Sequence, residues 1–189
     1  MINNNVLFRL SNLCIFETKK AMENKAAIDI LKTAIIMEKR GQAMYEEVVE
    51  KTKSEDVKKI FRTMADEENM HAKFLGEQLK NLMNNNSFVK QDLHAAEMDE
   101  SIISEILTDK ITSEISGAGF EAAAIGAAID METKSIEVYR KRAEESNDQN
   151  EKDLFNWLAD WEKGHYEVLN KLDQELKESI WNDNQFFPF

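Results

Sequence analysis

The sequence has few of the residues that interrupt helices or cross-link chains. It contains one proline and six glycines among 189 residues, so long stretches are free of helix breakers. Its single cysteine, Cys14, allows no disulfide within the chain and no Cys-x-x-Cys metal site, which favours a reducing compartment. The residues that dominate instead, such as Ala, Glu, Lys, Leu and Met, are good helix formers. An all-α protein is predicted.

Basic residues and long apolar runs are also scarce. Lysine and arginine number 24 against 36 acids, a net charge of -12. Nonspecific nucleic-acid binding needs a basic surface, and anionic membranes attract basic segments, so neither partner is expected. No apolar run approaches the roughly 18 residues of a membrane span. Residues 1–5 are a poor start for a secretion signal, and we expect a cytoplasmic protein.

Apolar residues at spacings of three and four predict four long helices. The predicted ranges are about 25–53, 55–83, 120–145 and 151–178. Short turns make the helices of each pair antiparallel neighbours, whereas residues 84–118, with a short helix at about 99–116, form a long crossover. We therefore predict one domain over residues 25–180, an antiparallel four-helix bundle with a crossover between the second and third helices.

The two ends of the chain are harder to interpret. Residues 1–24 contain apolar clusters with loose helical spacing, which fit a short helix packed on the body or on a partner subunit; a cloning-derived segment is the alternative. Residues 181–189 form an aromatic tail that contains the only proline, Pro188. We expect its aromatic side chains to cover an apolar surface.

Acids interrupt the apolar stripe of every predicted helix. Two of them begin a Glu-x-x-His motif, Glu68 with His71 and Glu162 with His165. Residues three apart lie on one face of a helix, so each carboxylate points the same way as its imidazole. The other two interrupting acids are Glu38 and Glu132.

These six residues belong to an internal repeat. Each residue of the first half has its counterpart 94 positions later: Glu38 and Glu132, Glu68 and Glu162, His71 and His165. The same offset pairs Tyr45 with Tyr139 and Phe61 with Phe155. The chain therefore consists of two copies of a helix pair, over about residues 25–83 and 119–178. A two-fold arrangement would bring four acids and two histidines to one level of the core.

The chemistry of this set favours two metal ions. Four carboxylates in an apolar core would repel one another and lose their hydration, and two divalent cations offset both costs. Carboxylates can bridge two ions and imidazole suits iron, although manganese and zinc accept the same ligands. Six shared ligands leave coordination positions open for a reactant. The alternative is that the helices turn these acids toward solvent.

Neighbouring residues have their own interpretations. Tyr45 and Tyr139 lie two turns beyond Glu38 and Glu132 on the same face. They either pack in the core or donate a hydrogen bond to a ligand carboxylate.

We expect Asp66 and Asp160 to form ion pairs or contact a neighbouring helix, and Trp157 and Trp161 to be packing residues. Glu67 lies beside Glu68, but its counterpart is Trp161, so we assign it to the flank of the site.

One combination of motifs resembles the rubrerythrin-like branch of the ferritin-like di-iron carboxylate superfamily over about residues 25–180. The motifs are Ile36-Met37-Glu38, Glu68-Asn69-Met70-His71, Asp130-Met131-Glu132 and Glu162-Lys163-Gly164-His165. The resemblance implies a ferritin-like bundle with two iron ions. It implies that Glu68 and Glu162 bridge the irons, that Glu38 and Glu132 are terminal ligands, and that His71 and His165 each complete one iron.

The resemblance also implies reduction of peroxide or dioxygen with electrons from an external donor protein. Two departures matter. One cysteine is too few for a rubredoxin-type centre, and Ser135 stands where rubrerythrins carry an additional ligand glutamate. A ferroxidase that handles iron and a non-catalytic metal-binding module therefore remain alternatives. We also expect a homodimer, because a long crossover permits exchange of helix pairs between chains.

Overall fold

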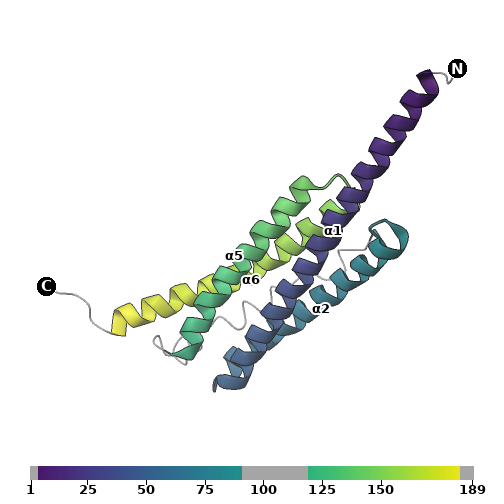
Figure 1. The fold of residues 1–189 in the computed structure, drawn as a ribbon. Helices are drawn as coiled ribbons and strands as arrows, with labels where there is room; N and C mark the ends of the chain where they lie inside the picture. The colour runs from purple at the N-terminus through teal and green to yellow at the C-terminus, as the bar shows by residue number, and fades with distance from the viewer. Residues whose placement is uncertain (1–3, 91–118, 184–189) are drawn as a thin grey trace.

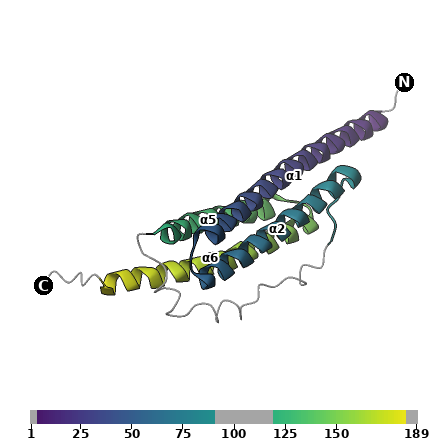
Figure 2. The same cartoon turned by 90° about the horizontal axis from the view of Figure 1, so that it is seen from below.

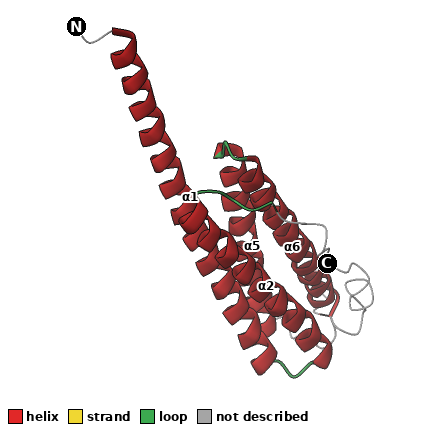
Figure 3. Cartoon of the chain, turned by 90° about the vertical axis from the view of Figure 1, so that its right-hand side faces the viewer, coloured by secondary structure: helices red, strands yellow, loops and turns green. Residues whose placement is uncertain are grey.

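The computed structural model describes residues 4–90 and 119–183, and every regular element in these ranges is a helix (Figure 3). The helices are α1 Asn4–Lys51, α2 Glu55–Asn85, α5 Phe120–Glu145 and α6 Gln149–Asp183. The predicted all-α four-helix bundle is therefore confirmed.

The helices form two antiparallel pairs. α1 packs along α2 and α5 along α6, and α1 also meets α5 (Figures 1 and 2). Each pair is joined by a turn of three residues, 52–54 and 146–148, so its two helices return along each other. The crossover, with its predicted helix at about 99–116, lies outside the described residues.

Two helices are longer than the apolar pattern predicts. α1 begins at Asn4 rather than near residue 25 and projects beyond the other helices (Figures 1 and 3). No glycine or proline precedes Gly41, so nothing stops the helix from continuing. The short helix expected within residues 1–24 is thus the start of α1.

At the other end of the chain, α6 continues to Asp183 and includes the exposed Trp181. Residues 184–189 of the predicted tail lie outside the described part. Despite their length, none of the described helices is apolar enough over a sufficient stretch to cross a membrane.

Local side-chain chemistry fixes both turns. Ser54 Oγ accepts a hydrogen bond from the Val57 backbone N–H at 3.2 Å and caps the first turn of α2, a role that serine commonly has at a helix N-terminus. At the other turn, Ser146 Oγ donates to Glu151 Oε2 at 2.5 Å, and Arg142 pairs with the same carboxylate at 2.6 Å. These contacts hold each pair in register, which sets the level of the acids on facing helices.

Two apolar clusters fill the core, one on each side of the acids. One contains Tyr45 and Phe61, and the other contains their repeat counterparts Tyr139 and Phe155. The ring centroids of Tyr45 and Phe61 are 5.7 Å apart, and those of Tyr139 and Phe155 are 5.8 Å apart. The sequence repeat is therefore matched by a repeat in the packing. Every helix contributes to both clusters, and its interrupting acid lies between the two contributions.

The cap of α2 makes a testable contribution to stability. Replacing Ser54 by alanine leaves the Val57 N–H without its acceptor, and we expect the free energy of unfolding to fall by about 1 kcal/mol. Urea denaturation followed by circular dichroism measures it. Ser54→Asp keeps an acceptor and should retain most of the stability; an equal loss in both variants would contradict the capping role.

Candidate metal centre

All six residues singled out by the repeat are buried at the middle of the bundle. Each of the four acids and both histidines is at most 2 % exposed. Glu38 comes from α1, Glu68 and His71 from α2, Glu132 from α5, and Glu162 and His165 from α6. The helices therefore do not turn these acids to solvent, and the alternative orientation is excluded.

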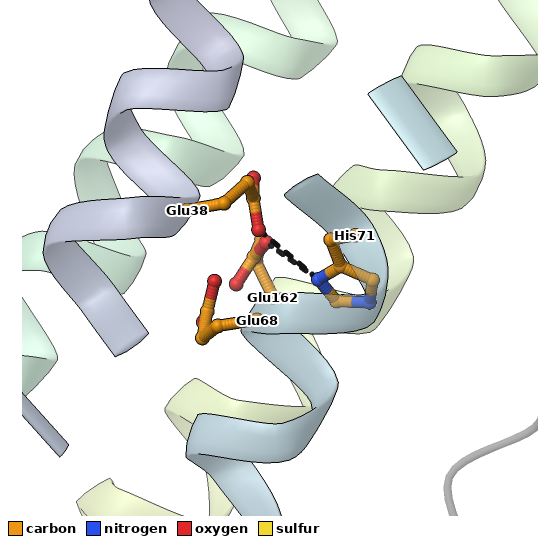
Figure 4. Close-up of side chains that lie close together, drawn as sticks. All are labelled: Glu38, Glu68, His71 and Glu162. Atoms are coloured by element: carbon orange, nitrogen blue, oxygen red, sulfur yellow. Dashed lines mark hydrogen bonds and ion pairs between the residues drawn. The ribbon is translucent and has the colours of Figure 1, made fainter. Parts of the chain in front are cut away.

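The six side chains form two overlapping groups. The ligand atoms within each group lie within 4.8 Å of one another. The first group, drawn in Figure 4, is Glu38, Glu68, His71 and Glu162, and the second is Glu68, Glu132, Glu162 and His165. Glu68 and Glu162 belong to both groups, so their carboxylates lie where two neighbouring ions would share them.

Several buried polar atoms at the centre have no hydrogen-bond partner among the described residues. They include Glu68 Oε1, Glu132 Oε2, both carboxylate oxygens of Glu162, and Nδ1 of His165. Buried polar atoms are almost always satisfied, so a cluster of exceptions needs a cause. Oxygen and imidazole nitrogen atoms that converge in this way fit divalent metal ions.

The pKa values of the four acids are shifted in opposite directions. Burial, followed by the charges of neighbouring carboxylates, raises the pKa of Glu68 and Glu162 well above its usual value. Burial also acts on Glu38 and Glu132, but interactions above all with the nearby histidines outweigh it and lower the pKa of both acids. The surrounding glutamates likewise outweigh the effect of burial and raise the pKa of His165. Without a cation, the centre thus opposes ionisation of Glu68 and Glu162 and favours the charged form of His165.

Both tyrosines donate hydrogen bonds to acids of the centre, and they do so across the two halves. Tyr45 on α1 donates to Glu132 Oε1 on α5, and Tyr139 on α5 donates to Glu38 Oε1 on α1. Burial, followed by the nearby carboxylate charges, raises the pKa of both phenols well above its usual value. The phenols therefore remain protonated and donate to these acids, while their rings also pack in the two apolar clusters. That the acids are metal ligands stays a prediction.

Comparison with known proteins agrees with this geometry. A family model described as Rubrerythrin matches residues 29–173. The chain belongs to the rubrerythrin family. Among solved structures, a hypothetical protein from Pyrococcus furiosus is similar at 24 % identity, with a TM-score of 0.57 over 80 % of this chain and 90 % of that one. At this identity the likeness shows the fold alone. Comparison with curated proteins gives no significant match.

Small residues occupy two related positions next to the acids of this rubrerythrin-family chain. Ser135, where an additional glutamate was expected from the resemblance, is 5 % exposed. Its repeat counterpart is Gly41. A Cβ added at Gly41 would lie 3.1 Å from Glu68 Cδ and 3.2 Å from Met131 Cε. Glycine thus leaves room for the Glu68 carboxylate.

Three contacts of the centre differ from the sequence-based expectations or extend them. Glu67, assigned to the flank, lies with Oε2 2.8 Å from His165 Nε2. Trp157 and Trp161 pack in the core as expected, but they do so edge-on against His71, at centroid distances of 5.5 and 5.3 Å. The clue in the sequence is that Glu67 and Trp161, one residue before Glu68 and Glu162, break the repeat.

The two aspartates near the motifs behave differently from each other. Asp160 pairs with Arg140, which also donates to Asn156 at 2.8 Å. Asp66 is exposed. Ion pairing was therefore a correct expectation for Asp160.

Glycine substitutions test the crowding around Glu68. We expect Gly41→Ala to weaken the binding of ferrous iron, because the Glu68 carboxylate must shift by a few tenths of an ångström. Gly76 and Gly126 are matched controls, since a Cβ there meets no atom within 4 Å, and alanine at either should stabilise its helix by about 0.5–1 kcal/mol. Anaerobic iron titration and urea denaturation measure the two effects. Unchanged iron affinity in Gly41→Ala would contradict the interpretation.

Removing either tyrosine hydroxyl group should destabilise the metal-free protein. Tyr45→Phe and Tyr139→Phe each remove a hydrogen bond to a buried acid, and we expect a loss of about 1.5–3 kcal/mol. The two losses should be similar because the contacts are related by the repeat. Urea denaturation at neutral pH measures them, with Tyr166→Phe, outside the centre, as the control. If only one of the two variants lost stability, the two hydrogen bonds would not contribute equally to the free energy of unfolding, which would contradict the prediction.

Proposed function

We propose that the chain holds two iron ions between its four buried glutamates and two histidines and uses them to reduce peroxide or dioxygen. The observation that carries the proposal is the sharing of Glu68 and Glu162 between two ligand groups. Glu38 with His71 and Glu132 with His165 would each complete one end of the pair. Membership of the rubrerythrin family supports iron as the metal.

When bound, two ferrous ions supply the two electrons that, together with two protons, convert hydrogen peroxide to two molecules of water. The chain keeps this reaction in a dry environment, because apolar clusters close the core on both sides of the acids. Tyr45 and Tyr139 hold the carboxylates of Glu132 and Glu38 in place through their phenol groups. These hydrogen bonds would fix the orientation of the carboxylates that hold the metal ions.

The electrons must return from outside, since one cysteine is too few for a rubredoxin-type centre within these 189 residues. We therefore propose an external electron-donor protein as a partner. A cytoplasmic location and a homodimer with exchanged helix pairs remain predictions, and the crossover that would permit the exchange lies outside the described residues.

A ferroxidase is the second candidate, and Ser135 favours it. A rubrerythrin-type peroxidase is expected to use an additional glutamate at this position, and serine offers no carboxylate in its place. A ferroxidase needs only to oxidise ferrous iron with dioxygen and release the ferric product. The two candidates share the metal centre and differ in the preferred oxidant and in the fate of the iron.

Rapid mixing of the iron-loaded protein with oxidant tests the function. Metal-free protein is loaded with two equivalents of ferrous iron under anaerobic conditions and mixed with hydrogen peroxide or dioxygen. We expect the bound iron to be oxidised faster than ferrous iron in buffer, with peroxide preferred by a peroxidase and dioxygen by a ferroxidase. If neither oxidant reacts faster with the bound iron, the protein is a non-catalytic metal-binding module.

A conservative variant separates loss of metal from loss of fold. Glu162→Gln keeps the shape of the side chain but replaces an ionisable carboxyl group, buried beside three other acids, with an amide that cannot ionise. We expect weaker iron binding together with equal or greater stability of the metal-free protein, because unpaired buried charge is costly. Glu77→Gln, at an exposed position of α2, should change neither. Full iron binding by Glu162→Gln would rule out a bridging role for Glu162.

A further inference from the structure

The two halves of the chain carry the same ligands but differ just outside them. The repeat offset of 94 pairs Glu67 with Trp161 and Thr63 with Trp157. A carboxylate in one half thus corresponds to an indole in the other. Glu67 contacts His165, whereas Trp157 and Trp161 contact His71. The surroundings of the two histidines therefore differ, although the histidines themselves are equivalent in the repeat.

His165 uses both of its ring nitrogens. Its Nε2–H donates to Glu67 Oε2 at 2.8 Å, across from α6 to α2. Its Nδ1 faces the carboxylates of the centre, 3.3 Å from Glu68, 3.4 Å from Glu162 and 3.6 Å from Glu132. The Glu67 side chain is 17 % exposed, so it is largely screened from water. One nitrogen is therefore directed at the metal position and the other is held by a carboxylate.

His71 lacks the second of these contacts. Its Nδ1 lies 3.1 Å from Glu38 Oε2 and 3.7 Å from Glu162 Oε1, so it too presents Nδ1 to the centre. Its buried Nε2, however, has no hydrogen-bond partner in the part of the chain that the structure describes. The edges of Trp157 and Trp161 pack on the ring instead. On the Nε2 side, only packing orients this imidazole.

We propose that Glu67 is a positioning residue that holds His165 through its Nε2–H and makes the His165 end of the centre the tighter of two unequal metal positions. A carboxylate partner fixes the tautomer and orientation of a ligand imidazole and increases its basicity. Trp161 supplies no such acceptor to His71. The inference rests on the proposed function, because it concerns how the chain holds the two metal ions.

A merely structural role would leave a different signature. If the Glu67–His165 contact only joined α2 to α6, its removal would lower the stability of the bundle and leave the affinities of both metal positions in the same ratio. If Glu67 positions the ligand, its removal weakens one position selectively. The relation between the two affinities is therefore the decisive measurement.

Zinc is a suitable probe because it accepts the same ligands and is diamagnetic. Calorimetric titration of the metal-free protein with zinc should show two unequal sites. In Glu67→Ala we expect the tighter site to lose about 10–100-fold in affinity while the other is unchanged. Glu67→Gln keeps an oxygen acceptor without the charge and should fall in between. Asp66→Asn removes a charge from the adjacent, exposed position of the same helix and should behave as wild type.

Magnetic resonance gives a readout that is independent of affinity. The chain contains three histidines, so the ¹⁵N signals of the zinc-loaded protein can be assigned by substitution. We expect the His165 Nε2 proton to exchange slowly with solvent, and to exchange faster and shift in Glu67→Ala. This measurement and Glu67→Gln carry the test if Glu67→Ala fails to fold.

The possible failures are distinguishable. Wild-type protein that binds no metal would overturn the proposed function and this inference with it. Wild-type protein that binds two zinc ions, together with Glu67 variants whose two affinities are unchanged or fall by the same factor, would overturn the inference alone. An unchanged His165 Nε2 proton in Glu67→Ala would do the same.

Discussion

Burial of four carboxyl groups at one level of an apolar core is the constraint on which the rest of the structure depends. Desolvation and mutual repulsion oppose ionisation of all four, and the pKa shifts of Glu68 and Glu162 express this opposition. The two tyrosine hydroxyls and the histidines offset only part of it, since several carboxylate oxygens still lack a partner among the described residues. Two divalent cations would satisfy the remainder. Without such cations, part of the free-energy cost of burying these four acids therefore remains.

The internal two-fold explains how one chain assembles such a centre. Two copies of a helix pair supply equivalent acids and histidines, and the tyrosine of each copy donates a hydrogen bond to an acid of the other copy. The hydrogen bonds of Tyr45 and Tyr139 thus join the two halves, and the centre depends on their association. The symmetry ends among the residues that contact the histidines, because Glu67 of the first half corresponds to Trp161 of the second. Equivalent ligands can thus be held in unequal surroundings.

The site is most predictable from the sequence where periodicity and repetition coincide. An acid in an apolar stripe is anomalous, and its recurrence 94 residues later identified Glu38 and Glu132 as readily as the Glu-x-x-His pairs. The role of Glu67 was missed because its partner, His165, lies on α6 and the repeat offers no equivalent pair. The length of α1 was underestimated because helical periodicity weakens in its first part, although no residue there stops a helix.

Sequence alone predicts the helices, their pairing through short turns, and which acids and histidines share a face, because these properties follow from local spacing along a helix. Which residues of different helices meet depends on the tertiary structure. It directed Tyr45 to Glu132 rather than to Glu38 on its own helix, and Glu67 to His165. Such contacts depend on how facing helices are rotated and shifted against each other, which is set by the packing of whole side chains and not by spacing within one helix.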